Sequence, residues 1–178
     1  MGNKALLVID IQEDYTGVNA SKKTRYKNAD ELVIRVNKII GQCRRKNIDL
    51  IYIKQEFKGF IPILLTKLFS HGSAIEGRPG TEFDKRLKIL SENCFSKSMP
   101  SAFTNVELKN YLKKKKIEEL YIVGLDGQFC VNETTKGAVK EKYRVNLIKN
   151  AVLFKNEGKR EEVFEKLKEI GVKIIEEI

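Results

Sequence analysis

The sequence predicts a three-layer α/β/α fold around a central, mostly parallel, doubly wound sheet of about six strands. Short apolar runs alternate with segments of helical periodicity along the 178 residues. The runs are continuous rather than alternating, as in strands buried on both faces of a parallel sheet. No internal repeat or low-complexity linker interrupts the chain. Its length suits one domain, so we predict a single domain over residues 1–178.

The predicted elements follow one another in regular order. Apolar runs predict strands at residues 4–9, 49–54, 94–97, 120–124, 144–148 and 172–177. Helical spacing predicts helices at residues 29–45, 105–116, 132–142 and 161–170. The first helix is predicted to bury Leu32, Val36, Ile39, Ile40 and Cys43 on one face. The last is predicted to point Val163, Phe164, Leu167 and Ile170 inward. Asn105 is a candidate N-cap of the second helix.

Composition narrows the class of protein. Lys and Arg number 34 against 24 Asp and Glu, a formal net charge of +10. The basic residues are spread out and no aromatic residues interleave with them, so we expect no nucleic-acid partner. The net positive charge can instead attract small anionic molecules toward the protein. No apolar run approaches the roughly 18 residues of a membrane span, and the opening residues lack a signal-peptide pattern. We therefore expect a cytoplasmic protein without a membrane partner.

The cysteines and the histidine limit the chemistry. Cys43, Cys94 and Cys130 are an odd number of thiols without close spacing, which argues against a disulfide framework and a CxxC metal site. His71 is the only histidine, so a site with several histidine ligands is excluded. A Cys–His protease pair would need His71 as its histidine. The loop position of His71 favours packing at the surface or rim over that role.

Charged and nucleophilic residues follow several predicted strands directly. Asp10 follows the first strand, Lys97 ends the third, and Asp126 and Cys130 follow the fourth. Ligands of open α/β sheets bind beyond the carboxyl ends of the strands, so we expect these residues on one rim. Taken singly, Asp10 also suits a turn cap, Lys97 a surface charge and Cys130 a small core residue. Their common placement favours a site.

The residue types fit nucleophilic acyl transfer. A free thiol has a pKa of about 8.5, and a nearby Lys97 ammonium and a helix N-terminus at Cys130 would both favour its thiolate. Asp10 could accept the thiol proton and return it to a leaving amine. Backbone N–H groups of residues 126–130 could form an oxyanion hole.

Four motifs in order resemble the isochorismatase-like cysteine hydrolase family over almost the whole chain. They are ALLVIDIQEDY (5–15), RPGTEFDKRL (78–87), FSKSMPSAF (95–103) and YIVGLDGQFCVNETTKGAV (121–139). One such motif alone would be weak, whereas four in the family's order are specific.

The resemblance implies a catalytic triad of Asp10, Lys97 and Cys130. It also implies an oxyanion hole made by the backbone N–H groups of Asp126 and Cys130, and a cis peptide bond without proline at Leu125–Asp126. Members of the family are often dimers or tetramers, so we expect a homo-oligomer.

Two departures from the family pattern bear on function. Members commonly carry Thr-Asp where this chain has Gly127 and Gln128. The family's nicotinamidases bind a divalent metal through an Asp and several His after the second strand, and the segment YIKQEFKGF (52–60) has none of them. We therefore expect no metal and no cofactor.

Cys130 favours hydrolysis of a C–N bond, because isochorismatases proper cleave a vinyl ether and lack the nucleophilic cysteine. The expected substrate is a small amide, carbamoyl or ureido compound. Two alternatives stay open. One is a non-catalytic or weakly active binding protein on the same fold, and the other is a nicotinamidase-like enzyme without the metal site.

Candidate substrate-binding residues surround this rim. Tyr15 and Phe129 are candidates for stacking on the substrate, and Phe129 also suits simple packing. Glu56 and Arg78 are candidate polar specificity groups, although surface charge suits both. The stretch 57–80 is too long for a tight turn. A helix on the core or a dimer interface suits it, and a lid over the rim is the alternative.

Overall fold

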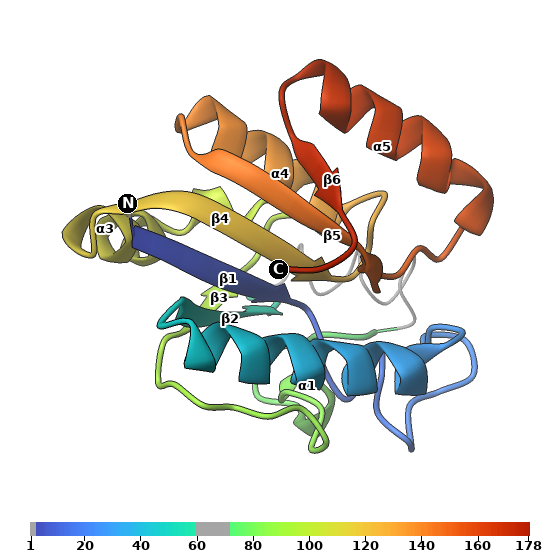
Figure 1. Ribbon diagram of the computed structural model, residues 1–178. Coiled ribbons are helices and arrows are strands. Elements are labelled where there is room, and N and C mark those ends of the chain that lie inside the picture. Colours follow the sequence, from blue (N-terminus) through green and yellow to red (C-terminus); the bar gives the residue numbers. More distant parts are fainter. Residues whose placement is uncertain (1–2, 60–71) are drawn as a thin grey trace.

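Six parallel strands form one sheet in the order β3-β2-β1-β4-β5-β6 (Figure 1). The computed structural model describes residues 3–59 and 72–178. The strands are β1 (Asn3–Ile9), β2 (Asp49–Gln55), β3 (Cys94–Lys97), β4 (Ile117–Gly124), β5 (Arg144–Val152) and β6 (Lys173–Ile175). The predicted six-stranded sheet is confirmed. Every strand pair in the described residues is parallel, where the sequence predicted a mostly parallel sheet.

Helices cover both faces of the sheet. They are α1 (Ala29–Arg45), α3 (Val106–Lys114), α4 (Cys130–Lys140) and α5 (Arg160–Glu169). Figure 1 shows α1 below the sheet and α4 and α5 above it. Two separate groups of buried apolar side chains match this division, one shared with α1 and the other with α3, α4 and α5. The predicted three-layer α/β/α fold is confirmed.

Alternate residues of β1 explain why its apolar run is unbroken. Ala5, Leu7 and Ile9 face the core shared with α3, α4 and α5, while Leu6 and Val8 face the core shared with α1. A strand covered on both faces must be apolar at every position. β1 therefore anchors both layers, and the residue that follows it emerges from the centre of the molecule.

The sheet reverses its winding direction beside β1. The chain adds β2 and β3 on one side of β1, then returns to add β4, β5 and β6 on the other. The point where winding reverses leaves a crevice at the carboxyl ends of the strands, where open α/β sheets bind ligands. The loops that follow β1 and β4 meet at this point.

Element boundaries differ from the sequence prediction at several places. α4 begins at Cys130 rather than at residue 132, and β4 and β5 are longer than predicted. α3 ends at Lys114, and its Asn105 side chain accepts a hydrogen bond from Leu108 N–H at 3.0 Å, as a cap does. Ile170 was expected to face inward, but it is 43% exposed. It lies just beyond α5, where Gly171 takes a φ of 90° and turns the chain.

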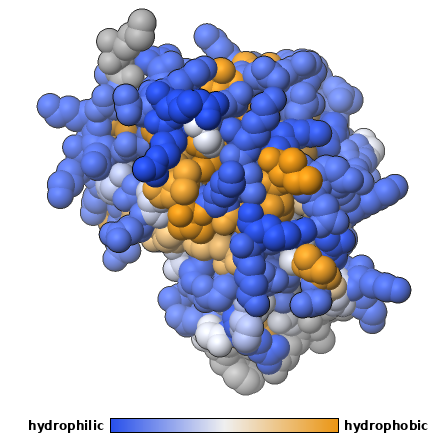
Figure 2. Space-filling view, turned by 60° about the horizontal axis from the view of Figure 1, so that its bottom comes forward, coloured by the Kyte–Doolittle hydropathy of each residue, from blue (hydrophilic) through white to orange (hydrophobic). Residues whose placement is uncertain are grey.

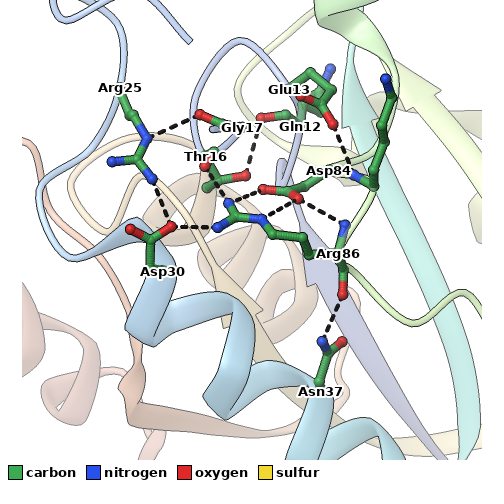
Figure 3. A network of polar contacts seen from close by, with 10 residues as sticks. Gln12, Glu13, Thr16, Gly17, Arg25, Asp30, Asn37, Asp84 and Arg86 are labelled. Carbon is green, nitrogen blue, oxygen red and sulfur yellow. Dashed lines mark hydrogen bonds and ion pairs between the residues drawn. The ribbon is translucent and has the colours of Figure 1, made fainter. Parts of the chain in front are cut away.

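An arginine network fastens the loop after the short 3-10 helix η1 (Pro79–Thr81) to the start of α1 (Figure 3). Arg86 holds both oxygens of the buried Asp84 carboxylate, at 2.9 and 2.6 Å, and also pairs with Asp30. Arg25 donates to the same Asp30 at 2.6 Å. Asn37 of α1 donates to the Arg86 carbonyl at 2.8 Å. The connection between β1 and α1 is thereby held from its outer side.

The surface is mainly hydrophilic on the face seen in Figure 2, with apolar atoms exposed between charged side chains. Ile34 of α1 is 71% exposed. Across residues 3–59 and 72–178, no helix has the length and apolar character to cross a membrane. Residues 60–71, which include His71, lie outside the described residues. They form the middle of the stretch 57–80 that was expected above to be a helix on the core, a dimer interface or a lid.

Replacing Ile122, which is fully buried in β4, with alanine should lower the free energy of unfolding by about 2–5 kcal/mol, because the cavity left behind loses packing contacts. Ile34→Ala is the matched control and should change it by less than about 0.5 kcal/mol. Urea denaturation followed by circular dichroism measures both. Similar losses in the two variants would contradict the assignment of β4 to the core.

Candidate active site

A buried lysine ammonium stands at the carboxyl edge of the sheet. Lys97 Nζ lies 2.8 Å from Asp10 Oδ2 and 3.2 Å from Cys130 Sγ, and it donates to Gln55 Oε1. Lys97 ends β3, Gln55 ends β2, Asp10 follows β1, and Cys130 begins α4 after β4. The four neighbouring strands at this end of the sheet each deliver one group. The structure thus brings together the three residues predicted as a triad.

The backbone fixes Asp10 firmly in place. Its N–H donates to Ile53 O of β2 at 2.9 Å, and its φ of 55° lies in the left-handed region that residues other than glycine rarely adopt. One carboxylate oxygen contacts Lys97. The other, Oδ1, is buried and has no hydrogen-bond partner in the part of the chain that the structure describes. Asp10 therefore keeps a free acceptor position beside the thiol and the ammonium.

Burial controls the protonation of the site. It raises the pKa of the Cys130 thiol to about 12; the Asp10 carboxylate adds to the rise and the Lys97 ammonium opposes it. Lys97 thus acts in the expected direction, toward the thiolate, but burial outweighs it and the net shift of the thiol pKa is upward. Burial also raises the pKa of Asp10 above its usual range, against the pull of Lys97.

The pKa of Lys97 is also raised. Burial alone would lower it, but the charges of Asp10 and Cys130 outweigh that effect. The site therefore holds a lysine that stays charged beside a thiol and a carboxyl group whose affinities for a proton are both raised. Such a carboxylate can act as a general base.

Gln55 was not among the predicted site residues, although it directly follows the predicted strand 49–54 and so holds the kind of position that pointed to Asp10 and Lys97. Its backbone is held by Gln12, whose amide oxygen accepts from Gln55 N at 2.8 Å. The Gln12 amide nitrogen donates to Gln55 O at 3.0 Å and to Thr81 O at 2.8 Å. Gln12 and Thr81, both from the motifs quoted above, thus support the end of β2 rather than line the site.

The segment before Cys130 turns sharply after β4. The Leu125–Asp126 peptide bond is cis. Asp126 O accepts from the N–H groups of Phe129 and Val131, at 3.1 and 2.9 Å, which folds residues 126–131 into the first turn of α4. The N–H groups of Asp126 and Cys130 make no hydrogen bond to another residue within the described ranges. Both N–H groups are therefore available as donors in the turn that leads to Cys130.

Close packing explains why residue 127 is a glycine. A Cβ placed there would lie 2.2–2.6 Å from ring atoms of Phe154, far inside van der Waals contact. The Gly127 N–H donates to Leu153 O at 2.8 Å, which brings this segment against the end of β5. The ring of Phe154 therefore occupies the space that a side chain at residue 127 would fill.

A cavity of about 550 Å³ opens over the reactive groups. Asp10, Gln55 and Cys130 contribute to its lining. Its apolar walls come from Tyr15, Tyr26, Phe57, Pro100, Leu125 and Phe129. Both residues proposed for stacking, Tyr15 and Phe129, thus line the cavity, and Phe129 is 55% exposed beside the nucleophile segment.

Comparison with known proteins identifies the family. The sequence model of the family described as Isochorismatase domain matches residues 4–177. The chain belongs to the isochorismatase family.

Several similar proteins carry the names amidase or nicotinamidase. A probable inactive nicotinamidase from Arabidopsis thaliana is 27% identical over 149 residues, covering 79% of this chain and 75% of that protein. The N-carbamoylsarcosine amidase from Thermoplasma acidophilum is 20% identical, with a TM-score of 0.82 over 97% of this chain and 95% of that one. Nicotinamidase from Bacillus subtilis is 22% identical, with a TM-score of 0.84 over 97% and 99%. The amidase and nicotinamidase structures thus share their fold with this chain.

The residues after β2 do not fit the metal site of the family's nicotinamidases. The side-chain oxygen of Gln55 already contacts the Lys97 ammonium, and Phe57 presents a ring without a donor atom to the cavity. Glu56, between them, pairs with Lys54 at 3.0 Å. Within residues 3–59 and 72–178, no group of three or more His, Cys, Asp and Glu residues is arranged to hold a metal ion.

The two candidate polar specificity groups lie away from the cavity. Glu56 is buried and paired with Lys54, and it is not among the described residues that line the cavity. Arg78 is exposed beside η1 and is likewise absent from that lining. Glu56 points away because side chains alternate along an extended chain, and Gln55 takes the inward position.

Gly127→Ala should lower the free energy of unfolding by about 1–3 kcal/mol, because the new methyl group collides with the ring of Phe154. Gly41→Ala in α1 is the matched control. The nearest atom to its new Cβ is the end of the Arg45 side chain at 3.6 Å, so it should raise stability by about 0.5–1 kcal/mol through better helix propensity. Urea denaturation distinguishes them. Changes of the same sign in the free energy of unfolding of the two variants would refute the packing explanation for Gly127.

Proposed function

We propose that this isochorismatase-family protein hydrolyses the C–N bond of a small amide, carbamoyl or ureido compound through a thioester on Cys130. The observation on which this proposal rests is that Lys97 Nζ contacts both Asp10 Oδ2 and Cys130 Sγ at the base of an apolar cavity. A base, a cation and a thiol within contact distance are what acyl transfer to sulfur requires. The names amidase and nicotinamidase among the similar structures support an amide substrate.

The acylation step uses all three groups. Cys130 Sγ attacks the carbonyl carbon of the substrate while the thiol proton passes to Asp10. Because the thiol pKa is raised, this proton must leave as the S–C bond forms. Lys97 stabilises the negative charge on sulfur. The N–H groups of Asp126 and Cys130 hold the oxyanion of the tetrahedral intermediate. Asp10 then returns the proton to nitrogen, the C–N bond breaks, and ammonia or an amine leaves.

Deacylation reverses the roles with water. Asp10 takes a proton from a water molecule, whose oxygen attacks the thioester carbonyl carbon. The second tetrahedral intermediate uses the same two N–H groups. When the C–S bond breaks, Asp10 returns the proton to sulfur and the carboxylic or carbamic acid product leaves. The raised proton affinity of Asp10 suits a group that accepts and returns a proton in both halves.

The cavity favours a small, flat substrate with little charge. Tyr15 and Phe129 supply ring surfaces on its wall, and the buried charges of Asp10 and Lys97 beside the sulfur are paired with each other. The homo-oligomeric state and the cytoplasmic location expected above belong to the same proposal. So does the expectation that neither nucleic acid nor a membrane is a partner.

A panel of small amides, N-carbamoyl amino acids and ureides, assayed for ammonia release, should contain at least one substrate. Cys130→Ser should lower kcat by at least about 1,000-fold, since loss of a nucleophile removes the covalent route. Cys94→Ser, which changes an exposed thiol, is the matched control and should retain wild-type kcat. Ammonia release that survives in Cys130→Ser would refute the mechanism. Silence across the panel would favour the non-catalytic alternative.

Asp10→Asn should change the rate of catalysis and the pKa of the Cys130 thiol in ways that can be measured separately. Loss of the general base should lower kcat by about 100- to 10,000-fold. The pKa of Cys130 should nevertheless fall below about 12, because the carboxylate that helps to raise it is gone while Lys97 stays. The rate of Cys130 alkylation by iodoacetamide, measured against pH by peptide mass spectrometry, reports that pKa. A thiol pKa that rises or stays constant would contradict the charge arrangement described above.

A further inference from the structure

The Asp126 carboxylate is fully engaged by protein donors. Its Oδ1 accepts from Gln128 N–H at 2.6 Å. Its Oδ2 accepts from the Tyr26 hydroxyl at 3.0 Å and from Lys155 N–H at 2.6 Å. The residue is buried at the turn that leads to Cys130. Both oxygens are therefore occupied by protein donors, and the side chain fixes the position of its own backbone.

Tyr26 reaches this carboxylate from the connection between β1 and α1, 100 residues earlier in the chain. Its N–H donates to Tyr15 O at 2.9 Å, and the rings of Tyr15 and Tyr26 meet edge to face with centroids 6.3 Å apart. Burial raises the pKa of the Tyr26 hydroxyl, with Asp126 adding to the rise, so this hydroxyl stays a donor at all ordinary pH values. The Tyr26 hydroxyl thus stays available as a donor to Asp126 near neutral pH.

Lys155 makes a second link between the same segments. Its backbone N–H donates to Asp126, and its ammonium donates to three successive carbonyls, those of Lys23, Thr24 and Arg25, at 3.1–3.3 Å. The ammonium also lies 5.0 Å from the centroid of the Tyr26 ring. Three ammonium protons with three acceptors leave no free donor. One side chain thereby clamps the residues before Tyr26.

Neither residue contacts the reactive groups directly. No hydrogen bond or ion pair joins Tyr26 or Lys155 to Cys130, Lys97 or Asp10 within the described residues. The clamped segment is also held on its outer side, where Arg25 donates to Gly17 O at 3.0 Å in the network of Figure 3. Tyr26 and Lys155 also line the cavity, so an effect that passes through Asp126 has to be separated from an effect on the cavity wall.

We propose that Tyr26 and Lys155 are positioning residues for the oxyanion hole. By holding the Asp126 carboxylate they keep the backbone N–H groups of Asp126 and Cys130 turned toward the carbonyl oxygen of the bound substrate. The inference rests on the proposed function, because it assigns these two residues to its tetrahedral intermediates. An oxyanion hole depends on donors fixed in advance, and loss of one donor costs about 100- to 1,000-fold, so loosening its support should cost about tenfold.

Tyr26→Phe removes only the hydroxyl, and Lys155→Met removes only the ammonium while its backbone N–H stays. Two distant changes match them in chemistry. Tyr143→Phe removes the hydroxyl from a ring that packs near Phe103, and Lys149→Met removes an ammonium paired with Glu176 on the surface. Thermal unfolding of all four variants provides the folding check, and Lys155→Arg, which keeps a cation, should regain part of any loss.

Benzaldehyde tests the oxyanion hole without a known substrate. Cys130 Sγ adds to its carbonyl carbon, and the thiol proton passes through Asp10 to the new hemithioacetal oxygen, which the two N–H groups bind. The adduct protects Cys130 from iodoacetamide. Benzyl alcohol has no carbonyl group and protects by occupying the cavity alone. The ratio of the two half-protecting concentrations isolates the contribution of the oxyanion hole from that of the cavity walls.

We expect Tyr26→Phe and Lys155→Met each to raise the half-protecting concentration of benzaldehyde about tenfold and that of benzyl alcohol less than about twofold. Alkylation without either probe should stay within about threefold, because Asp10 and Lys97 are untouched. Equal changes for both probes, slowed alkylation, or no change relative to Tyr143→Phe and Lys149→Met would overturn the inference. If benzaldehyde fails to protect even the wild-type thiol, the proposed function itself fails and the inference with it.

Discussion

A lysine ammonium without solvent contact organises the active-site end of this protein. Burying a cation is tolerable only when nearby groups compensate its charge and satisfy its donors. Lys97 meets this requirement with Asp10, Gln55 and Cys130, which come from three other strand ends. These strands must end side by side for the lysine to be satisfied. The order of the sheet and the chemistry of the site therefore depend on the same contact.

Support for the reactive groups is built mainly from side chains that hydrogen-bond to other segments of the chain. Gln12 holds the end of β2 through both atoms of its amide and also reaches the carbonyl of Thr81. The Asp126 carboxylate joins the nucleophile turn to two other segments through Tyr26 and Lys155. Residues that would be taken for reactive groups from their type alone thus serve as connections. Only Asp10, of the acids lining the cavity in the described chain, keeps a free carboxylate oxygen.

The local sequence pattern predicted the strands, because apolar runs buried on both faces are visible without tertiary information. The expectation that ligands bind beyond the carboxyl ends of the strands then brought Asp10 and Cys130 together. What depends on contacts between distant segments was not predictable. The thiol pKa follows from burial, which no spacing reveals. The reason for Gly127 is the ring of Phe154, 27 residues later. Ile170 continues the helical period, but the helix has already ended before it.

The central claim is that Cys130 carries the acyl group during turnover. Intact-protein mass spectrometry after rapid acid quench of a reacting mixture measures this directly, using whichever small amide gives ammonia. The account predicts a mass increase equal to the acyl group less one hydrogen, assigned to Cys130 by peptide analysis and absent from Cys130→Ala. Turnover at the wild-type rate with no adduct on this sulfur, or equal turnover by Cys130→Ala, would contradict it.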